Sequence, residues 1–387
     1  MKFSPLVDRI SGDGSDAWVT HYQAAAARAR GEDVIVLSIG DPDLEAPRVV
    51  VDRAIERLRA GDLRYTPASG RRPLLEAIAG AHSARSGQAV SAENVVYLAG
   101  AQNALFVASM CLAGPGDEVI TFDPMYATYP ATIEVSGARM IRAATGAGFR
   151  PDIGVLESLV SPRTRAIVWT TPSNPSGVII NQDELNTIAE IARRHGLWLV
   201  SDEVYAGLAP GGRVPSLAAT LPERVVTLGS LSKSHSLPGL RAGWLIGPRE
   251  LVRHAEALAM CMLFGLPGFI QEAAIAALSV AAEAEQRIRE LCNTRRDRML
   301  MGLCGIRGIR PVVPEAGMFM LVDVSDTGLS ASEFMRALYE RQRVSVMDGA
   351  AFGQRTRQFV RICFATEEAT IDTACARIRQ FCEQEMR

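Results

Sequence analysis

The chain has 387 residues, of which 48% are hydrophobic and 22% are charged, and its formal net charge at pH 7 is −2. This length allows two domains, or a large and a small one, around a big buried core, and the near-neutral charge argues against nucleic acid or an anionic membrane as the main partner. The seven cysteines form no C-x-x-C pair and no apolar run is long enough to span a bilayer, so we expect a cytoplasmic protein with reduced thiols.

The N-terminal part of the chain reads as an arm followed by the start of a larger unit. A helix is predicted over residues 16–30 and a strand over 34–39, which stops at the turn that begins with Gly40. A further helix over 47–60 leads to a loop that contains Tyr65. By their chemistry alone, Gly40 is a turn glycine and Tyr65 is a packing residue with a solvated hydroxyl.

Two units of strand, turn and helix follow. The first has a strand over 95–98, and its turn places Ala101 and Gln102 at a helix N-terminus, where free backbone N–H groups can bind an anion. The second has a strand over 118–122, and Tyr126 follows its carboxyl end. Ligands of open α/β sheets bind at that edge, although any parallel sheet also contains such turns.

The next two strands also end in polar side chains. The strand over 165–170 leads to the turn that contains Asn174, and we predict a cis peptide bond between Asn174 and Pro175. A helix is predicted over 181–195, with Asn181 as its cap and Gly196 at its end. The buried strand over 197–200 then delivers Asp202 and Tyr205, and an acidic residue there could simply cap the next helix.

An unusual lysine lies between two predicted strands, 225–228 and 244–247. Lys233 sits in a loop of small hydroxylated residues, and partial burial at a strand end lowers the pKa of a lysine, so that its neutral amine can attack a carbonyl. Ser230 and Ser232 supply hydroxyl groups and Arg241 a cation, which together suit one phosphate group. We therefore expect a partner that carries both a carbonyl and a phosphate.

The last third of the chain reads as an α+β unit that follows helices over 249–281 and 283–303. The helix over 249–281 is interrupted at 265–268 by glycine and proline. Arg361 lies within the apolar strand 359–365, and a buried arginine needs an anion unless it faces water from an edge strand. Arg361 is therefore a candidate for binding a carboxylate through paired hydrogen bonds.

These motifs resemble those of one family. Ser-x-Ser-Lys at 230–233 and Gly-x-Arg-x-Gly at 239–243 are similar to the signature of class I/II aminotransferases, which hold pyridoxal 5'-phosphate (PLP) as a Schiff base on that lysine. The resemblance covers Gly40 to Arg361 in matching order. It implies the α/β fold of type I PLP-dependent transferases, with a large domain whose mostly parallel sheet lies between helices and a smaller α+β domain. The implied division is an N-terminal arm at 1–45 that packs with the small domain, a large PLP-binding domain at 46–285 and a small domain at 286–387.

The resemblance also implies roles for individual residues. Lys233, Asp202 and Tyr205 would be catalytic, with Asp202 keeping the pyridine nitrogen of the cofactor protonated. The substrate carboxylate would meet Gly40, Asn174 and Arg361, and no metal is implied. A homodimer is expected, in which Tyr65 reaches the partner's site. The full set of implied cofactor-binding residues is Lys233, Ala101, Gln102, Tyr126, Asn174, Asp202, Tyr205, Ser230, Ser232, Arg241 and Tyr65.

The implied reaction moves the α-amino group of an L-amino acid to a 2-oxo acid such as pyruvate by a ping-pong mechanism. Arginine is one candidate donor, because residues 231–235, 261–265 and 269–272 resemble those of arginine:pyruvate transaminases. Residues 257–270 contain no arginine or lysine, which argues against a dicarboxylic substrate. Four acidic residues could meet a cationic substrate tail, although each singly reads as a surface charge: Asp13, Asp16, Asp43 and Glu45.

Other functions remain open at this point. The same fold and lysine serve β-eliminating carbon–sulfur lyases, and aminotransferases for aromatic or aliphatic amino acids share the motifs. A non-catalytic PLP-binding regulatory module is a further reading, but residues 1–30 are too short and not basic enough for the DNA-binding domain that would accompany it. The five histidines are scattered without metal-ligand spacing, and no phosphate-binding glycine motif indicates a nucleotide.

Overall fold

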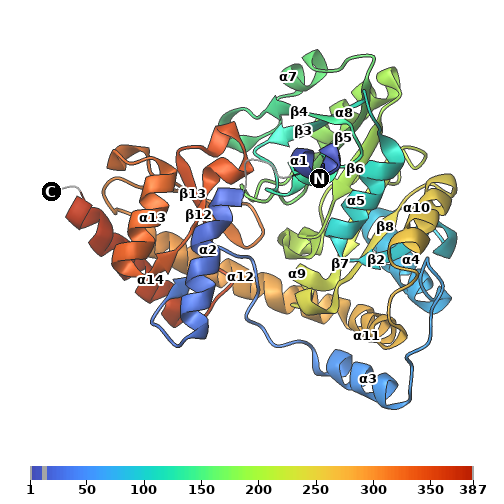
Figure 1. Cartoon of the computed structure of the whole chain (residues 1–387), viewed down its shortest axis with the longest axis horizontal. Coiled ribbons are helices and arrows are strands. Elements are labelled where there is room, and N and C mark those ends of the chain that lie inside the picture. Colours follow the sequence, from blue (N-terminus) through green and yellow to red (C-terminus); the bar gives the residue numbers. More distant parts are fainter. Residues whose placement is uncertain (1, 11–14, 386–387) are drawn as a thin grey trace.

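The structure is a computed structural model that describes residues 2–10 and 15–385. Its larger unit is built on a seven-stranded sheet with the order β2-β8-β7-β6-β5-β3-β4 (Figure 1). In chain order the strands are β2 (Val95–Ala99), β3 (Glu118–Asp123), β4 (Arg139–Ala144), β5 (Thr164–Thr170), β6 (Trp198–Asp202), β7 (Val225–Ser230) and β8 (Ala242–Ile246).

The strand directions bring several carboxyl ends to one edge of this sheet. The strands β3, β4, β5, β6 and β7 are parallel to one another, whereas β8 is antiparallel to both β7 and β2. Consequently β2 runs in the same direction as β7. The last residues of five strands meet at this edge: Ala99, Asp123, Thr170, Asp202 and Ser230. Open α/β sheets bind ligands there.

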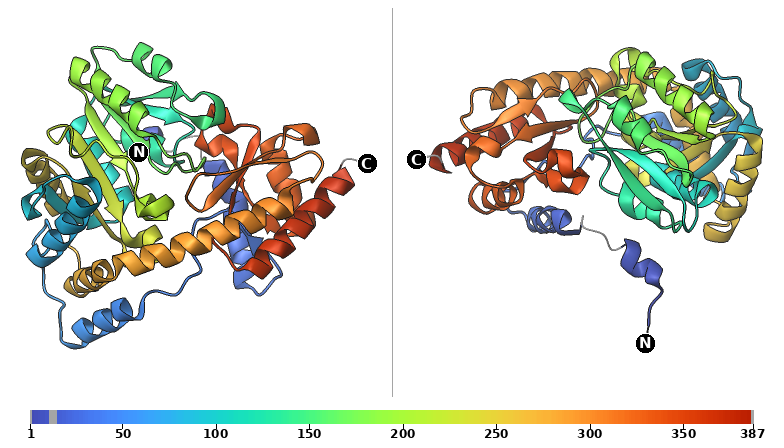
Figure 2. Two further views of the ribbon diagram at one scale, coloured as in Figure 1. Left: turned by 180° about the vertical axis from the view of Figure 1, so that it is seen from behind. Right: turned by 90° about the horizontal axis from the view of Figure 1, so that it is seen from above.

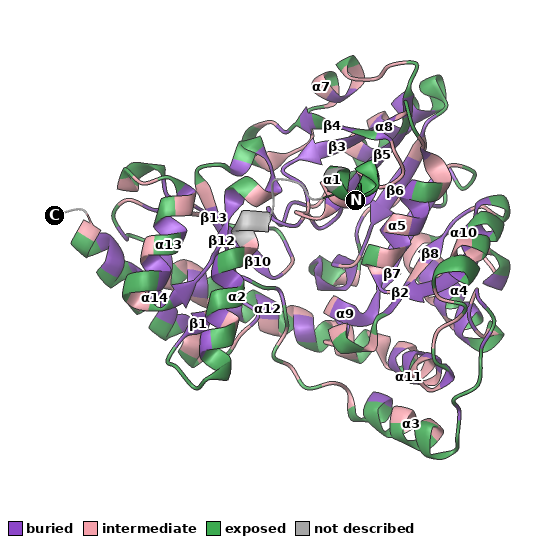
Figure 3. Ribbon diagram, in the orientation of Figure 1, coloured by how far each residue is buried: buried purple, intermediate pink, exposed green. Residues whose placement is uncertain are grey.

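Both faces of the large sheet are covered, as the almost uninterrupted burial of its strands other than the edge strand β4 requires (Figure 3). Alternate residues of one strand point to opposite faces: on β2, Val96 and Leu98 pack in one cluster, while Val95 and Tyr97 pack in another. The first face is covered by α5 (Ala101–Leu112), α6 (Tyr129–Glu134) and α10 (Arg249–Met262). On the other face lie α4 (Arg72–Ser86), α7 (Ile153–Ser158), α8 (Gln182–His195) and α11 (Gly268–Ser279).

A smaller unit follows in the C-terminal third. Its four-stranded antiparallel sheet has the order β12-β13-β10-β9. The strands are β9 (Arg310–Val312), β10 (Phe319–Asp323), β12 (Met347–Asp348) and β13 (Phe359–Cys363), and the helices α13 (Ala331–Gln342) and α14 (Glu368–Glu385) share their core. In the register of this sheet, Arg361 of β13 lies between Leu321 and Met347. Arg361 therefore lies on an inner strand that is paired on both sides, and not at an open edge of the sheet.

Two connections join the units. The long helix α12 (Ala281–Leu303) runs from the large unit into the small one, as Figure 2 shows from behind. The N-terminal segment contributes α1 (Pro5–Ile10), α2 (Ser15–Ala29) and β1 (Ile35–Val36), and β1 pairs in parallel with β11 (Val344–Ser345) of the small unit. Helix α3 (Arg48–Arg59) then lies against α11. Across the described residues, none of the helices combines the length and apolarity that crossing a membrane needs.

Local backbone features agree with the sequence predictions at α8 and at Asn174–Pro175, but not at Lys233. The capping box of α8 is present, because Asn181 and Glu184 bond each other's backbone N–H groups, and Gly196 closes the helix with φ +68°. The Asn174–Pro175 peptide is cis, as predicted. Lys233 does not lie in an irregular loop, however. It belongs to the one-turn helix α9 (Leu231–Ser234), because Ser230 caps that turn by accepting a hydrogen bond from the Ser232 amide.

Candidate active site

A cavity of about 150 Å³ lies at the carboxyl edge of the large sheet. It brings together residues from β2–α5, β5, β6, β7 and α9, which are far apart in the sequence. Predicted site residues that line it are Ala101, Gln102, Tyr126, Asn174, Asp202, Tyr205, Ser230, Ser232, Lys233 and Arg241. The remaining lining residues are Leu105, Thr170, Val204 and Pro238. The edge of the sheet therefore gathers most of the candidates into one chamber.

The amine of Lys233 points into this chamber. Its Nζ donates to the carbonyl oxygen of Gly40 at 2.5 Å, which ties the lysine to the turn after the first strand. Loss of hydration is the main cause that lowers the pKa of Lys233 from its usual value. Cys363 and Asp41 oppose this effect, and the nearby cations Arg361 and Arg241 add to it. The neutral, nucleophilic form of Nζ is thus easier to reach here than in water.

One end of the chamber is suited to an anion. Ser230 and Ser232 lie with their hydroxyl oxygens 2.8 Å apart, and the Arg241 guanidinium donates to the carbonyl oxygens of Ala99 and Pro238 at 3.1 and 2.9 Å. The backbone N–H groups at the start of α5 have no carbonyl of their own helix to bond. Together they form a cationic and N–H-rich corner that fits a phosphate.

Glycines allow this corner to close. A Cβ on Gly100 would lie 2.5 Å from Arg241 Nη2, and a Cβ on Gly243 would lie 2.4 Å from the carbonyl carbon of Gly100. Gly100 also has φ +88°, a region that favours glycine. Close packing therefore requires Gly100 beside the guanidinium and Gly243 against the Gly100 backbone, whereas a Cβ on Gly239 would meet nothing within 4 Å.

The side chain of Gln102 is not free to bind a phosphate, because both ends of its amide already bond threonines. Its amide nitrogen donates to Thr132 at 2.5 Å, and its amide oxygen accepts a hydrogen bond from Thr128 at 2.7 Å. The side chain therefore fastens α5 to the start of α6. Its backbone N–H remains the group that can face an anion at the helix N-terminus.

The carboxylate of Asp202 is buried at the wall of the chamber. Its Oδ1 accepts a hydrogen bond from the Val204 amide at 3.3 Å, and its Oδ2 accepts one from the Tyr129 hydroxyl at 3.1 Å. Burial raises the pKa of Asp202 to about 6, and the two hydrogen bonds oppose that rise. A cationic ring nitrogen beside this carboxylate would compensate its buried charge.

Aromatic and amide side chains complete the walls. Tyr126 lines the cavity and packs edge-on against Tyr129, with ring centroids 6.0 Å apart. The Asn174 amide donates to the Tyr205 hydroxyl at 3.3 Å. Burial raises the pKa of both Tyr126 and Tyr205, so each hydroxyl keeps its proton and can donate a hydrogen bond.

Arg361 lies behind Asn174 and reaches the chamber through it. Its Nη1 donates to Asn174 Oδ1 at 2.9 Å and its Nη2 to the Ser38 carbonyl oxygen at 2.7 Å, while Nε has no partner. The guanidinium stacks between Phe319 and Phe352, at 4.0 and 4.6 Å from their ring centroids. No carboxylate of the described residues pairs with it. A buried, unpaired cation of this kind calls for an external anion.

Tyr65 and the acidic candidates for the substrate tail that the structure describes are not among the residues that line this cavity. Tyr65 is 87% exposed and does not line the cavity. Asp43 is engaged by Arg295 in a paired ion bridge, with distances of 2.5 and 3.0 Å, which occupies the carboxylate. Glu45 lines a second pocket beside α12. Asp13 and the side chain of Asp16 lie outside the described part of the structure.

The residues of the chamber fit PLP. The donor set comprises a desolvated amine, an N–H-rich cationic corner and a buried carboxylate, and the close glycine packing shapes the corner. Lys233 would hold the aldehyde carbon, the corner around Arg241 the phosphate, and Asp202 the pyridine nitrogen. No cluster of three or more histidine, cysteine or acidic residues in the described part of the chain could bind a metal.

Sequence reasoning missed several residues of the site. Tyr129 binds Asp202, and its spacing of three residues from Tyr126 at a strand end was the available signal. Phe319 and Phe352 enclose Arg361, yet no local pattern distinguishes them from core residues. The Ser38 carbonyl could not have been found, since a backbone group carries no sequence signal.

Comparison with known proteins agrees with this site. The profile of the family described as aminotransferase class I and II matches residues 32–378. An arginine–pyruvate transaminase, AruH, of Pseudomonas aeruginosa is 43% identical over 98% of this chain and 97% of its own length. The aspartate aminotransferase of Geobacillus stearothermophilus is 30% identical over 93% of this chain and 94% of its own length.

Solved structures show the same architecture. The aspartate aminotransferase of Thermus thermophilus with maleate has a TM-score of 0.93 at 28% identity, covering 98% of this chain and all of the other. An aspartate aminotransferase of Thermotoga maritima has a TM-score of 0.90 at 30% identity, with the same coverage. The fold predicted from the sequence motifs, a type I PLP-dependent transferase, is therefore confirmed.

Proposed function

This chain belongs to the class I and II aminotransferases, and we propose that it moves the α-amino group of L-arginine to pyruvate. The family establishes that the protein is a PLP-dependent aminotransferase. The proposal adds the identity of the amino donor. The observation that carries the proposal is the buried Arg361, which has no anionic partner among the described residues and reaches the Lys233 chamber through Asn174. That arrangement suits an α-carboxylate held next to a nucleophilic amine.

Substrate binding follows from the free donors of Arg361. Two of its nitrogens already bond Asn174 and Ser38, which fixes the guanidinium plane, and Nε remains unpartnered. A substrate carboxylate that reaches this guanidinium would gain charge-assisted hydrogen bonds from an arginine whose plane is already fixed. Asn174 lies between Arg361 and Tyr205, so we assign it to both the carboxylate and the cofactor's phenolic oxygen.

Proton transfer is assigned to Lys233. When bound, PLP supplies an aldehyde that carries the amino group and a ring that accepts electron density from the substrate α-carbon. The Nζ atom of Lys233 has a pKa below its usual value, so it can take a proton from the α-carbon and return it to another carbon nearby. Its hydrogen bond to the Gly40 carbonyl oxygen holds Nζ next to the turn that contains Gly40.

Asp202 and the corner around Arg241 are assigned to cofactor binding. The Asp202 carboxylate, held by Tyr129 and Val204, would keep the ring nitrogen protonated. Ser232, Arg241 and the first N–H groups of α5 would bind the phosphate, with Ser230 capping the lysine helix. Tyr126 would pack against the face of the ring.

Arginine as donor rests on two observations. The relative with 43% identity is an arginine–pyruvate transaminase, whereas the aspartate-specific relatives are about a third identical or less. Residues 257–270 also carry no cation that could meet a second substrate carboxylate. Asp43 is already paired with Arg295, so Glu45 is the candidate for the guanidinium tail that remains among the described side chains.

We also propose a cytoplasmic homodimer in which Tyr65 of each subunit completes the partner's site. The support is the position of Tyr65, which is highly exposed and lies outside its own cavity. Boundaries at 45/46 and 285/286 are proposed for the arm, the large domain and the small domain. They accord with the pairing of β1 with β11 and with the passage of α12 between the two units.

A donor screen tests the proposed function. The purified enzyme with PLP and pyruvate is given L-arginine, L-lysine, L-aspartate or L-phenylalanine, and alanine formation is followed by mass spectrometry. We expect kcat/KM for L-arginine to exceed that for L-aspartate by at least about tenfold, the size of one well-placed polar contact. A preference for aspartate or phenylalanine would refute arginine as the donor. Release of hydrogen sulfide, ammonia and pyruvate from L-cysteine alone, with no alanine formed when pyruvate is added, would instead indicate a lyase.

A further inference from the structure

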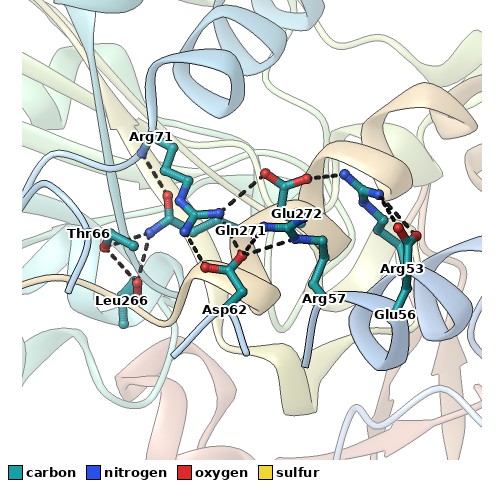
Figure 4. A network of polar contacts seen from close by, with 9 residues as sticks. All are labelled: Arg53, Glu56, Arg57, Asp62, Thr66, Arg71, Leu266, Gln271 and Glu272. Carbon is teal, nitrogen blue, oxygen red and sulfur yellow. Dashed lines mark hydrogen bonds and ion pairs between the residues drawn. The ribbon is translucent and has the colours of Figure 1, made fainter. Parts of the chain in front are cut away.

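A polar network joins α3, the loop over residues 62–71 and α11 (Figure 4). Asp62 accepts hydrogen bonds from Arg57 at 3.2 Å and from Arg71, and Glu272 accepts from Arg53 at 2.5 Å and from Arg71 at 3.3 Å. None of these residues lines the Lys233 cavity as it is described. The family reaction therefore gives this network no role through direct contact.

Gln271 is the central member that links the two loops. Its side chain is fully buried, and its amide nitrogen donates to Thr66 Oγ1 at 2.9 Å and to the Leu266 carbonyl oxygen at 2.8 Å. Its amide oxygen accepts a hydrogen bond from the Arg71 backbone N–H at 2.7 Å. Thr66 Oγ1 in turn donates to the Leu266 carbonyl oxygen at 2.8 Å. One amide thus satisfies buried backbone groups of both loops.

The two loops are in close contact as well as hydrogen-bonded. A Cβ on Gly265 would lie 2.6 Å from the Thr66 carbonyl oxygen, and Gly265 has φ +126°. A Cβ on Gly268 would lie 2.5 Å from Asp62 Oδ1. The loops over 62–71 and 264–268 therefore cannot shift independently while Gln271 bridges them.

Each loop carries an exposed aromatic side chain. Tyr65 is 87% exposed and Phe264 is 53% exposed, and their rings meet edge-on with centroids 4.8 Å apart. Phe264 is held at φ +56°, which is uncommon for a bulky residue. Thr66 directly follows Tyr65, so the bonds of Gln271 are one residue away from this exposed ring.

We propose that Gln271 is a positioning residue that fixes Tyr65 for the active site of the neighbouring subunit. The inference rests on the proposed function, in which Tyr65 meets the phosphate of the partner's cofactor. Gln271 itself touches neither cofactor nor substrate and acts through Thr66 and the edge-on contact of Tyr65 with Phe264. Replacing it should loosen cofactor binding in the partner while leaving the amine chemistry of Lys233 intact.

Hybrid dimers of the full chain separate this effect from ordinary destabilisation. One subunit carries Lys233→Ala, so only the site with the other subunit's Lys233 links the cofactor and gives the visible absorption band. In the proposed dimer, the site that keeps Lys233 is completed by Tyr65 of the other subunit, which carries Lys233→Ala. Gln271→Leu is therefore placed either in the Lys233→Ala subunit or in the subunit that keeps Lys233. The apoprotein is titrated with PLP, and the dissociation constant is read from the band.

We expect PLP binding to weaken by about fivefold to tenfold when Gln271→Leu accompanies Lys233→Ala, and by less than about twofold when it accompanies Lys233. At saturating PLP, kcat should stay within about twofold in both hybrids. The matched control is Gln286→Leu, which changes an exposed glutamine on α12 and should leave PLP binding unaltered in either subunit. Equal weakening in both arrangements, or none in either, would overturn the positioning role of Gln271.

Further variants keep the test decisive. Tyr65→Phe in the Lys233→Ala subunit tests the underlying premise: if it leaves PLP binding unchanged, the proposed contact of Tyr65 fails, whatever Gln271 does. Weakening by Tyr65→Phe without weakening by Gln271→Leu would refute only the inference about Gln271. Should Gln271→Leu not fold, Thr66→Val removes the same bridge, and Thr66→Ser restores the hydroxyl. The inference requires weaker PLP binding in the valine variant and recovery in the serine variant.

Discussion

The Arg361 guanidinium donates a hydrogen bond of 2.9 Å to the Asn174 amide oxygen, across 187 residues of sequence. Asn174 belongs to the large unit and Arg361 to the middle of the small sheet, so this bond joins the two units at the active site. It also orients the arginine towards the chamber that contains Lys233. The geometry of a substrate carboxylate would therefore depend on how the two units are held together.

The variant Arg361→Lys tests that dependence. Lysine keeps the positive charge but cannot reproduce the planar set of donors that bonds Asn174, Ser38 and a carboxylate at once. We expect kcat/KM for the amino donor to fall on the order of 100-fold, with PLP binding unchanged. Steady-state kinetics with pyruvate as acceptor measure it, and the exposed Arg357→Lys serves as the control. An unchanged kcat/KM would exclude Arg361 as the carboxylate ligand.

The variant Gly100→Ala tests the phosphate corner. The added Cβ would lie 2.5 Å from Arg241 Nη2, and φ +88° is unfavourable for alanine, so the guanidinium has to move. We expect PLP affinity to fall by about tenfold or more, measured by titration of the apoprotein. Gly114→Ala is the matched control, because a Cβ there meets nothing within 4 Å. Equal PLP affinity of the two variants would contradict the assignment of this corner.

The variant Asp202→Asn gives a pH-dependent signature in the apoprotein. The pKa of Asp202 is raised from 3.8 to about 6 by burial, so between these values the folded state holds a proton that the unfolded state has released. The free energy of unfolding of the wild type should therefore fall as pH rises through this window, a loss that asparagine does not share. The stability of the variant relative to wild type should increase by about 2 kcal/mol between pH 4 and 6.

Chemical denaturation of the two apoproteins at several pH values measures this difference. Glu203, whose pKa burial raises to about 7, titrates in both proteins, so the comparison cancels most of its contribution. A stability difference that stays constant from pH 4 to 6 would mean that Asp202 does not carry a buried, uncompensated charge at neutral pH. Because a ring cation would compensate that charge, saturating PLP should reduce the pH dependence of the wild type.

Much of the fold could be predicted from local signals. Small-residue turns after apolar strands located most of the sheet edge, and the Asn181 and Gly196 caps placed α8 closely. The signals were strongest where one conformation satisfies the local backbone, as at these caps. Local signals were weaker around Lys233, where a short helix replaces the expected loop. The helix begins because the Ser232 amide donates a hydrogen bond to the Ser230 hydroxyl, and the residue spacing does not reveal this bond.

The parts that could not be predicted depend on distant partners. The link between Tyr129 and Asp202 and the stacking of Arg361 between Phe319 and Phe352 form only when separate strands meet. Asp43 looked like a free acidic residue, yet Arg295 of α12 engages it 252 residues later. Sequence patterns report local geometry, whereas these contacts are set by tertiary packing.

The most direct test of the account is a half-reaction followed by absorption spectroscopy. The purified enzyme loaded with PLP is mixed with L-arginine alone, and pyruvate is added afterwards, with Lys233→Ala as the control. We expect the visible band of the lysine-linked cofactor to disappear with L-arginine, to return with pyruvate, and to be absent from Lys233→Ala. A wild-type protein that shows no such band when supplied with PLP would contradict the central role of Lys233.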